Sequence, residues 1–137
     1  MTPLLDVNVL VALAWPSHIH HLRARRWFLA RSDVPWASSP ATQLGMVRLS
    51  ANPAVVDPPL TVLDAAMLMA ELQALPGHEF WADDVAATDI DWIGIVTYRH
   101  VPAAHLVALA ERRGGRVATL DRRLAARAGP RLTELID

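Results

Sequence analysis

Two residue types are missing from this chain of 137 residues: cysteine and lysine. Without cysteine, the chain cannot form disulfide bonds, thiolate zinc sites or cysteine nucleophiles. Without lysine, it cannot use a Walker-type phosphate loop or Schiff-base chemistry. Its thirteen basic residues are all arginine, and fourteen acidic residues balance them to a net charge of −1. The chain therefore has no global positive field, and any contact with nucleic acid must be local.

Long apolar runs are also missing. No stretch approaches the roughly 20 apolar residues of a membrane span, and no basic region precedes the first apolar run as in a secretion signal. We therefore expect a cytoplasmic protein with no membrane contact. The composition of 53% hydrophobic and 20% charged residues is typical of a globular chain, and residues 1–137 suffice for one domain with a full core.

Apolar runs alternate with helical patterns along the chain. Residues 3–11 resemble a buried parallel strand that is interrupted only by Asp6 and Asn8. Further strands are predicted at 34–37, 79–82, 116–120 and 131–136, and helices at 9–15, 18–30, 40–50, 61–75, 102–113 and 122–128. No clear pattern covers residues 83–98. This alternation predicts an α/β fold, a three-layer sandwich around a central, mostly parallel sheet.

The spacing of apolar residues also predicts which helix faces are buried. For the helix at 18–30, the predicted inner face is Leu22, Trp27 and Phe28. For the helix at 61–75, the predicted inner face is Val62, Ala65, Ala66, Leu68, Met69 and Leu72.

Polar residues follow two of the predicted strands at the point where each strand ends. Asp6 ends the first run, Asn8 lies one side-chain period further on, and Asp121 ends the strand at 116–120. Ligands of parallel α/β sheets gather at the carboxyl ends of the strands. Two carboxylates about 4 Å apart repel by roughly 4 kcal/mol at an effective dielectric near 20, and a magnesium or manganese ion removes that conflict. Each aspartate alone is explained as a helix cap, but the pair at one sheet edge favours a metal site.

Four segments, in order, resemble the motifs of the PIN-domain ribonucleases. LLDVNVL at residues 4–10 is similar to their first motif, and VATLDRRL at 117–124 is similar to their last acidic motif. TQLGMVR at 42–48 and VPAAHLVALA at 101–110 stand where the two middle motifs belong. The resemblance covers nearly the whole chain and is closest to the VapC-type toxins of bacterial toxin–antitoxin pairs.

This resemblance implies the toxin of a type II toxin–antitoxin system, an endoribonuclease that depends on Mg²⁺, or on Mn²⁺, to cleave RNA phosphodiester bonds. Asp6 and Asp121 carry over as catalytic residues and metal ligands. Asn8 carries over as a catalytic polar partner that orients the first acid or the substrate. The resemblance also implies a homodimer and a cognate antitoxin that covers the site.

Two positions depart from the family pattern. Gln43 stands where many members carry glutamate, and Ala103 occupies the position of the third aspartate. Alanine cannot bind a metal, so we expect a nuclease that is impaired or inactive as the sequence stands. The alternative is a catalytically degraded PIN-like module that binds RNA or antitoxin without turnover.

Three arginines are candidates for RNA binding. Arg48 shares its predicted helix with Gln43, and Arg122 and Arg123 directly follow Asp121, from where they can contact RNA phosphates. The alternative for Arg48 is a surface arginine or an ion-pair partner, and the alternative for Arg122 and Arg123 is a solvated helix face. The histidines at 18, 20 and 21 are interpreted as surface or helix-start residues rather than as a zinc site.

Overall fold

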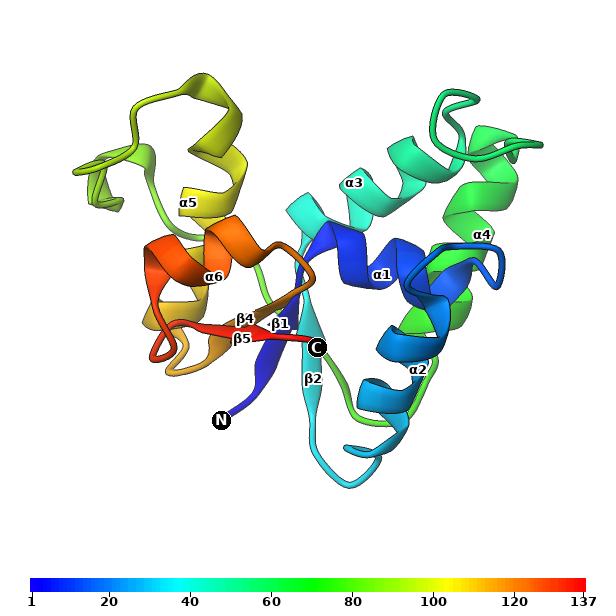
Figure 1. Cartoon of the computed structure of the whole chain (residues 1–137), viewed down its shortest axis with the longest axis horizontal. Helices are drawn as coiled ribbons and strands as arrows, with labels where there is room; N and C mark the ends of the chain where they lie inside the picture. The colour runs from blue at the N-terminus through cyan, green and yellow to red at the C-terminus, as the bar shows by residue number, and fades with distance from the viewer.

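Five short strands form the sheet of the computed structural model, which describes residues 1–137 (Figure 1). Their order across the sheet is β3-β2-β1-β4-β5, and each neighbouring pair is parallel. The strands are β1 Pro3–Leu5, β2 Trp36–Ser38, β3 His78–Phe80, β4 Arg116–Thr119 and β5 Thr133–Leu135. Because every strand runs in the same direction, all carboxyl ends lie along one edge of the sheet.

Helices cover both faces of this sheet, so the predicted three-layer α/β sandwich is confirmed (Figure 1). The α-helices are α1 Val7–Ala14, α2 His21–Leu29, α3 Pro40–Ser50, α4 Val62–Gln73, α5 Val101–Arg112 and α6 Arg122–Ala128. The segment without a clear sequence pattern, residues 83–98, contains the single-turn 3₁₀ helix η1 Ala87–Asp89, and a second one, η2 Tyr98–His100, begins at its last residue. No helix has the length and apolar character that a membrane crossing requires.

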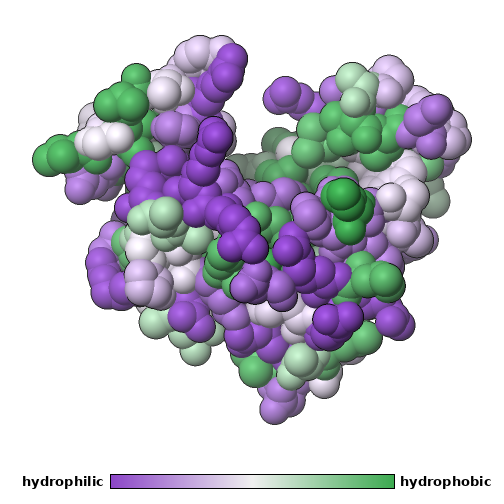
Figure 2. All heavy atoms as spheres, in the orientation of Figure 1, coloured by the Kyte–Doolittle hydropathy of each residue, from purple (hydrophilic) through white to green (hydrophobic).

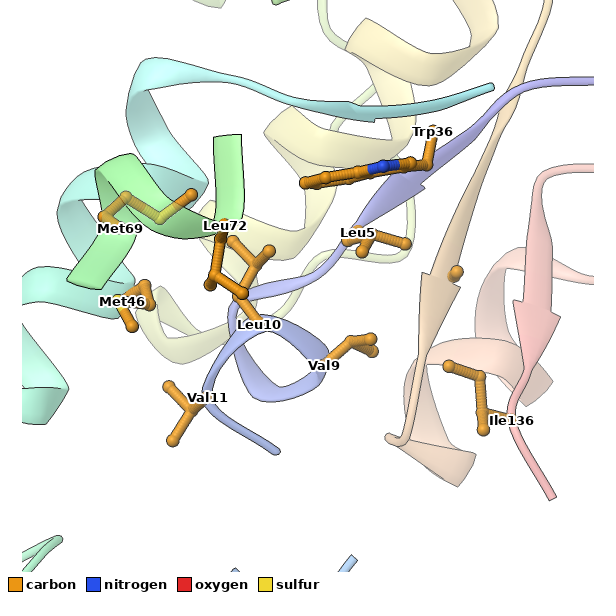
Figure 3. Close-up of a cluster of buried hydrophobic side chains, with 10 residues drawn as sticks. Leu5, Val9, Leu10, Val11, Trp36, Met46, Met69, Leu72 and Ile136 are labelled. Carbon is orange, nitrogen blue, oxygen red and sulfur yellow. The ribbon is translucent and has the colours of Figure 1, made fainter. Parts of the chain in front are cut away.

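Alternate residues of the central strands face two separate cores, as the two-residue period of a strand requires. Leu5 of β1 and Ala118 of β4 belong to the core beneath α1, α3 and α4, which Figure 3 shows together with Trp36 and Ile136. Leu4 and Val117, one residue earlier on each strand, face the second core beneath α5 and α6. The sheet is therefore buried on both sides, which explains its nearly continuous apolar strands.

Local capping signals fix where most helices begin and end. Ser39 and Thr42 form a capping box at the start of α3, and Thr61 caps α4. After α5, Gly114 has a positive φ of 66°, a conformation that favours glycine, and the chain turns into β4. The predicted helix starts at Pro40 and near Pro102 are confirmed to within one residue.

Three expectations about burial and boundaries are wrong. The first strand ends at Leu5 rather than continuing through residue 11, because Asp6 caps a helix that begins at Val7. Leu22 is 72% exposed, since the buried face of α2 runs through Ala24 on the opposite side of the helix. In α4, Val62 and Ala66 are also exposed, because α4 packs mainly on α3 and buries only a narrow stripe of Ala65, Met69 and Leu72.

Candidate active site

Strand pairing brings the two ends of the chain together at one edge of the sheet. Leu5 pairs with Ala118, and the Asp6 amide continues the ladder by donating to the Ala118 carbonyl at 2.9 Å. The next residues along the two strands are Asp6 and Thr119, which are 113 positions apart in the sequence. Gly45 permits the close approach of α3 at this point, because an added Cβ would lie 2.7 Å from a methyl group of Val7.

The Thr119 hydroxyl connects the polar side chains at this edge. It donates to Asp6 Oδ2 at 2.7 Å and accepts from the Asp121 amide at 3.0 Å and from Asn8 Nδ2 at 3.4 Å. Asn8 Oδ1 in turn accepts from the amide of Leu120 at 3.2 Å. Thr119 was not among the sequence-predicted residues, although a hydroxyl two residues before an aspartate at a strand end was a signal for it.

Asp6 is a partly buried carboxylate that forms no ion pair with a basic side chain. Burial raises the pKa of Asp6, and the charge of Asp121 raises it further. Hydrogen bonds from the Thr119 hydroxyl and the Val7 amide act in the opposite direction but do not cancel the rise in the pKa. A bound cation would relieve both the desolvation of Asp6 and its repulsion by Asp121.

Both aspartates also cap helices. Asp6 Oδ1 accepts from the Val7 amide at the start of α1, and Asp121 Oδ1 accepts from the Arg123 and Leu124 amides at 2.9 and 3.2 Å. The capping explanation is therefore confirmed for each residue alone. A cap uses only part of a carboxylate, since each group has two oxygens and several lone pairs. Capping and cation binding are compatible at this edge.

A pocket of about 350 Å³ opens above these residues and is lined by Asp6, Asn8 and Asp121 from the sheet edge. Ala41 and Thr42 line it from α3, and Pro102, Ala103 and His105 line it from α5. Figure 2 shows the molecule hollowed by a notch between two lobes, one with the start of α5 and the other with α3 and α4. Ala103 therefore lines the same pocket as Asp6 and Asp121.

Gln43 does not line this pocket. Its amide nitrogen donates to the Ser38 hydroxyl at 2.9 Å, and that hydroxyl also contacts His78 Nε2 at 2.7 Å. Ser38 is fully buried, and burial lowers the pKa of His78. Gln43 thus belongs to a neutral polar cluster between α3, β2 and β3.

The predicted RNA-binding arginines lie outside the pocket lining as well. Arg48, Arg122 and Arg123 are exposed, and Arg122 is paired with Asp137 at 2.9 Å. Arg99 of η2 does line the pocket. Sequence reasoning missed Arg99 because it follows a segment without periodicity, and no motif marks it.

The donor set fits one weakly held divalent cation. Magnesium in proteins is held by one or two carboxylates together with waters and substrate phosphates, and Asp6 and Asp121 supply two carboxylates in one pocket. No group of three or more histidine, cysteine, aspartate or glutamate side chains is arranged to hold a metal anywhere in residues 1–137, including the histidines near residue 20.

A parallel α/β sandwich with paired acids at the carboxyl edge defines the class of this protein as PIN-like. No protein-family model matches the chain. It is 52% identical over 118 residues to Ribonuclease VapC38 of Mycobacterium tuberculosis, covering 86% of this chain and 84% of the relative. It is 45% identical to Ribonuclease VapC39 of the same organism, covering 99% and 100% of the two chains, and 38% identical to Ribonuclease VapC29, covering 91% and 90%.

These identities extend over most of each chain. The protein belongs to the VapC family of PIN-domain ribonucleases.

Proposed function

We propose that this chain is the toxin of a type II toxin–antitoxin pair, a magnesium-dependent endoribonuclease whose turnover is impaired by Ala103. The observation that carries the proposal is the pocket that Asp6, Asp121 and Ala103 line together. The names of its relatives support an RNA-cleaving activity.

The residues of the sheet edge have different roles in this proposal. Asp6 and Asp121 are the ligands of Mg²⁺ or Mn²⁺, and a bound ion would supply activation of water and stabilisation of charge on the phosphodiester. Thr119 holds Asp6 Oδ2 in place through its 2.7 Å hydrogen bond. Asn8 is anchored by its oxygen to the Leu120 amide and directs its amide group toward Thr119.

Ala103 removes one ligand and one negative charge from this arrangement. With only two carboxylates, magnesium keeps more of its water shell and is positioned less firmly, because it dehydrates reluctantly. We therefore expect weak metal binding and slow cleavage. Gln43 does not compensate for Ala103, because its amide is neutral and lies outside the pocket lining, where it donates to the Ser38 hydroxyl.

A second candidate function is favoured by the same alanine. A PIN-like module that retains the pocket but lacks the third acid can bind RNA or antitoxin without turnover. The two functions differ in one measurable property, since only the nuclease cleaves RNA when the missing carboxylate is restored.

We also propose two protein partners for this chain: a cognate antitoxin and a second copy of the chain itself. Exposed apolar side chains gather in two places, which supports protein contacts there. The first group lies on α3 and α4 and consists of Leu44, Val62, Leu63 and Met67. The second lies before and at the start of α5 and consists of Ile93, Val96, Tyr98 and Val101. A homodimer and an antitoxin complex are the expected assemblies, in a cytoplasmic setting.

An RNA-cleavage assay tests the enzymatic part. The unsubstituted chain and Ala103→Asp are compared in Mg²⁺, in Mn²⁺ and in EDTA, with Ala30→Asp at the exposed end of α2 as the matched control. We expect cleavage by Ala103→Asp only with a divalent ion, and little gain from Ala30→Asp. An Ala103→Asp protein that is folded, binds RNA and still does not cleave it would establish the binding module instead.

Light scattering at micromolar concentration tests the assembly. We expect the chain alone to have the mass of a dimer. We expect a monomer mass when one of the two apolar groups is disrupted, either by changing Ile93 and Val96 to glutamate or by changing Leu63 and Met67 to glutamate. A monomer without antitoxin contradicts this part of the proposal.

A further inference from the structure

Two basic side chains line the pocket without taking part in the acid site: Arg99 from η2 and His105 from α5. We propose that Arg99 and His105 bind a backbone phosphate of RNA beside the acids, and that Asp83 positions His105. This inference rests on the proposed function, because it assigns the substrate phosphate within the same pocket.

Arg99 is available to bind an anion. It forms no ion pair with any carboxylate of the chain, and its guanidinium lies 5.8 Å from the ring of its neighbour Tyr98. A guanidinium binds phosphate through directed, charge-assisted hydrogen bonds. By contrast, Arg122 lies outside the pocket lining and already has Asp137 as a partner.

His105 is held at the pocket by a carboxylate from another segment. His105 Nε2 lies 3.8 Å from Asp83 Oδ1, and Asp83 Oδ2 accepts from the Ala41 amide in the first turn of α3 at 2.9 Å. Asp83 therefore connects the start of α3 to α5 across the pocket. The 3.8 Å separation is longer than a hydrogen bond, so the Asp83 carboxylate lies beside the ring without bonding to it and leaves the ring free to donate an N–H group to a ligand.

The position of these basic side chains matches the charge of a phosphodiester. Asp6 and Asp121 alone would repel the RNA backbone, since both acidic groups line the same pocket. Arg99 and His105 lie on the α5 side, from where they can offset that repulsion. Pro102 and His105 are three residues apart on α5 and so lie on one helix face, with Ala103 beside them.

Binding of a fluorescent single-stranded RNA, measured by anisotropy in EDTA, tests the phosphate site without turnover. We expect Arg99→Gln to weaken binding about tenfold and to lower the slope of log K against log salt by about 0.7, the value for one lost contact to a single strand. His105→Gln should weaken binding about threefold. Arg99→Lys should keep the salt slope, because the positive charge remains.

The control is Arg25→Gln, which removes an exposed arginine of α2 outside the pocket lining. If Arg99→Gln and His105→Gln bind RNA as Arg25→Gln does, the inference is overturned. If the natural chain binds no RNA, it is overturned as well.

The same substitutions in the Ala103→Asp protein separate this inference from the proposed function. Arg99→Gln should raise KM and leave kcat nearly unchanged, as expected for a group that binds substrate and transition state equally. Unchanged KM with continued cleavage refutes the phosphate site alone. No cleavage by Ala103→Asp, with weaker RNA binding by Arg99→Gln, refutes the nuclease and supports the phosphate site.

A double-mutant cycle tests Asp83 as a positioning residue. Asp83→Asn should weaken RNA binding about as much as His105→Gln, and should have no further effect in the His105→Gln protein. A purely structural role through the Ala41 amide would give additive losses instead, which would exclude positioning of His105.

Discussion

The two sides of the pocket differ in how firmly the chain itself fixes them. At the sheet edge, Asp6, Asn8 and Asp121 are joined through one buried hydroxyl and two adjacent strands. On the α5 side, the pocket-lining His105 only approaches Asp83 at 3.8 Å, and the pocket-lining Arg99 is exposed and forms no ion pair.

This difference shows which positions can change without loss of the fold. A substitution at the sheet edge disturbs a buried polar network, and such networks are costly when partly satisfied. Ala103 packs against the apolar core beneath α5, where alanine is compatible with the helix. The α5 side can therefore lose a functional side chain while the sheet edge remains intact.

The sharpest test of this contrast combines one substitution on each side. In the Ala103→Asp protein, Asp121→Asn should lower RNA cleavage on the order of 100-fold, since a positioned metal contributes several kcal/mol to the transition state. Single-turnover cleavage in Mg²⁺ measures the effect. Asp64→Asn, which neutralises an exposed aspartate of α4, is the control and should leave the rate unchanged.

The stability of the sheet edge provides the next test. Thr119→Val removes the hydroxyl that joins three partners, and should lower the free energy of unfolding by about 2–3 kcal/mol. Thr133→Val is the matched control, because Thr133 is also buried in a strand but donates mainly to the Gly129 carbonyl at 2.7 Å. Thr133→Val should lower the free energy of unfolding by about 1 kcal/mol. Equal losses in urea denaturation would show that Thr119 has no special role.

The buried charge of Asp6 predicts a pH dependence. Since the pKa of Asp6 is raised in the folded chain, its contribution to stability is complete below the ordinary carboxyl pKa and declines as the pH rises through the folded pKa. Asp6→Asn should remove this decline, so that in EDTA the variant gains stability over the natural chain toward neutral pH. Urea unfolding midpoints of both proteins from pH 4 to 8 measure this difference in stability. Added Mg²⁺ should make the difference smaller, because the ion stabilises the charged Asp6 carboxylate. A constant difference between the two proteins at every pH contradicts the prediction.

Substitution of Gln43 is expected to change stability and RNA cleavage the least. Gln43→Glu replaces a donor by an acceptor, but the Ser38 hydroxyl can donate to the new carboxylate while His78 Nε2 donates to Ser38. We expect a loss of less than about 1 kcal/mol in the free energy of unfolding, and no cleavage unless Ala103→Asp is introduced as well. Cleavage by Gln43→Glu alone would place residue 43 in the site after all.

Much of this architecture could be predicted from sequence because its signals are local. Ser39 before Pro40, and Gly114 after α5, mark helix boundaries by backbone chemistry that needs no tertiary context. The meeting of Asp6 and Asp121 in one pocket likewise follows from two parallel strands that end at the same edge.

Other features depend on contacts between distant segments and had no local signal. Residues 83–98 are held by isolated contacts such as the 2.9 Å hydrogen bond that the Ala41 amide donates to Asp83 Oδ2. The exposure of Leu22 and Val62 depends on which helix covers which, and a period of 3.6 residues does not specify that. Arg99 and His105 reach the pocket only through the placement of α5.

The contact between Asp6 and Thr119 also has a consequence for biosynthesis. Because the two residues are 113 positions apart, the site cannot form until almost the entire chain has left the ribosome. Closing so long a loop also requires β1 to pair with β4, a late and non-local step of folding. A nascent chain still being translated therefore has no assembled acid pair until synthesis is nearly complete.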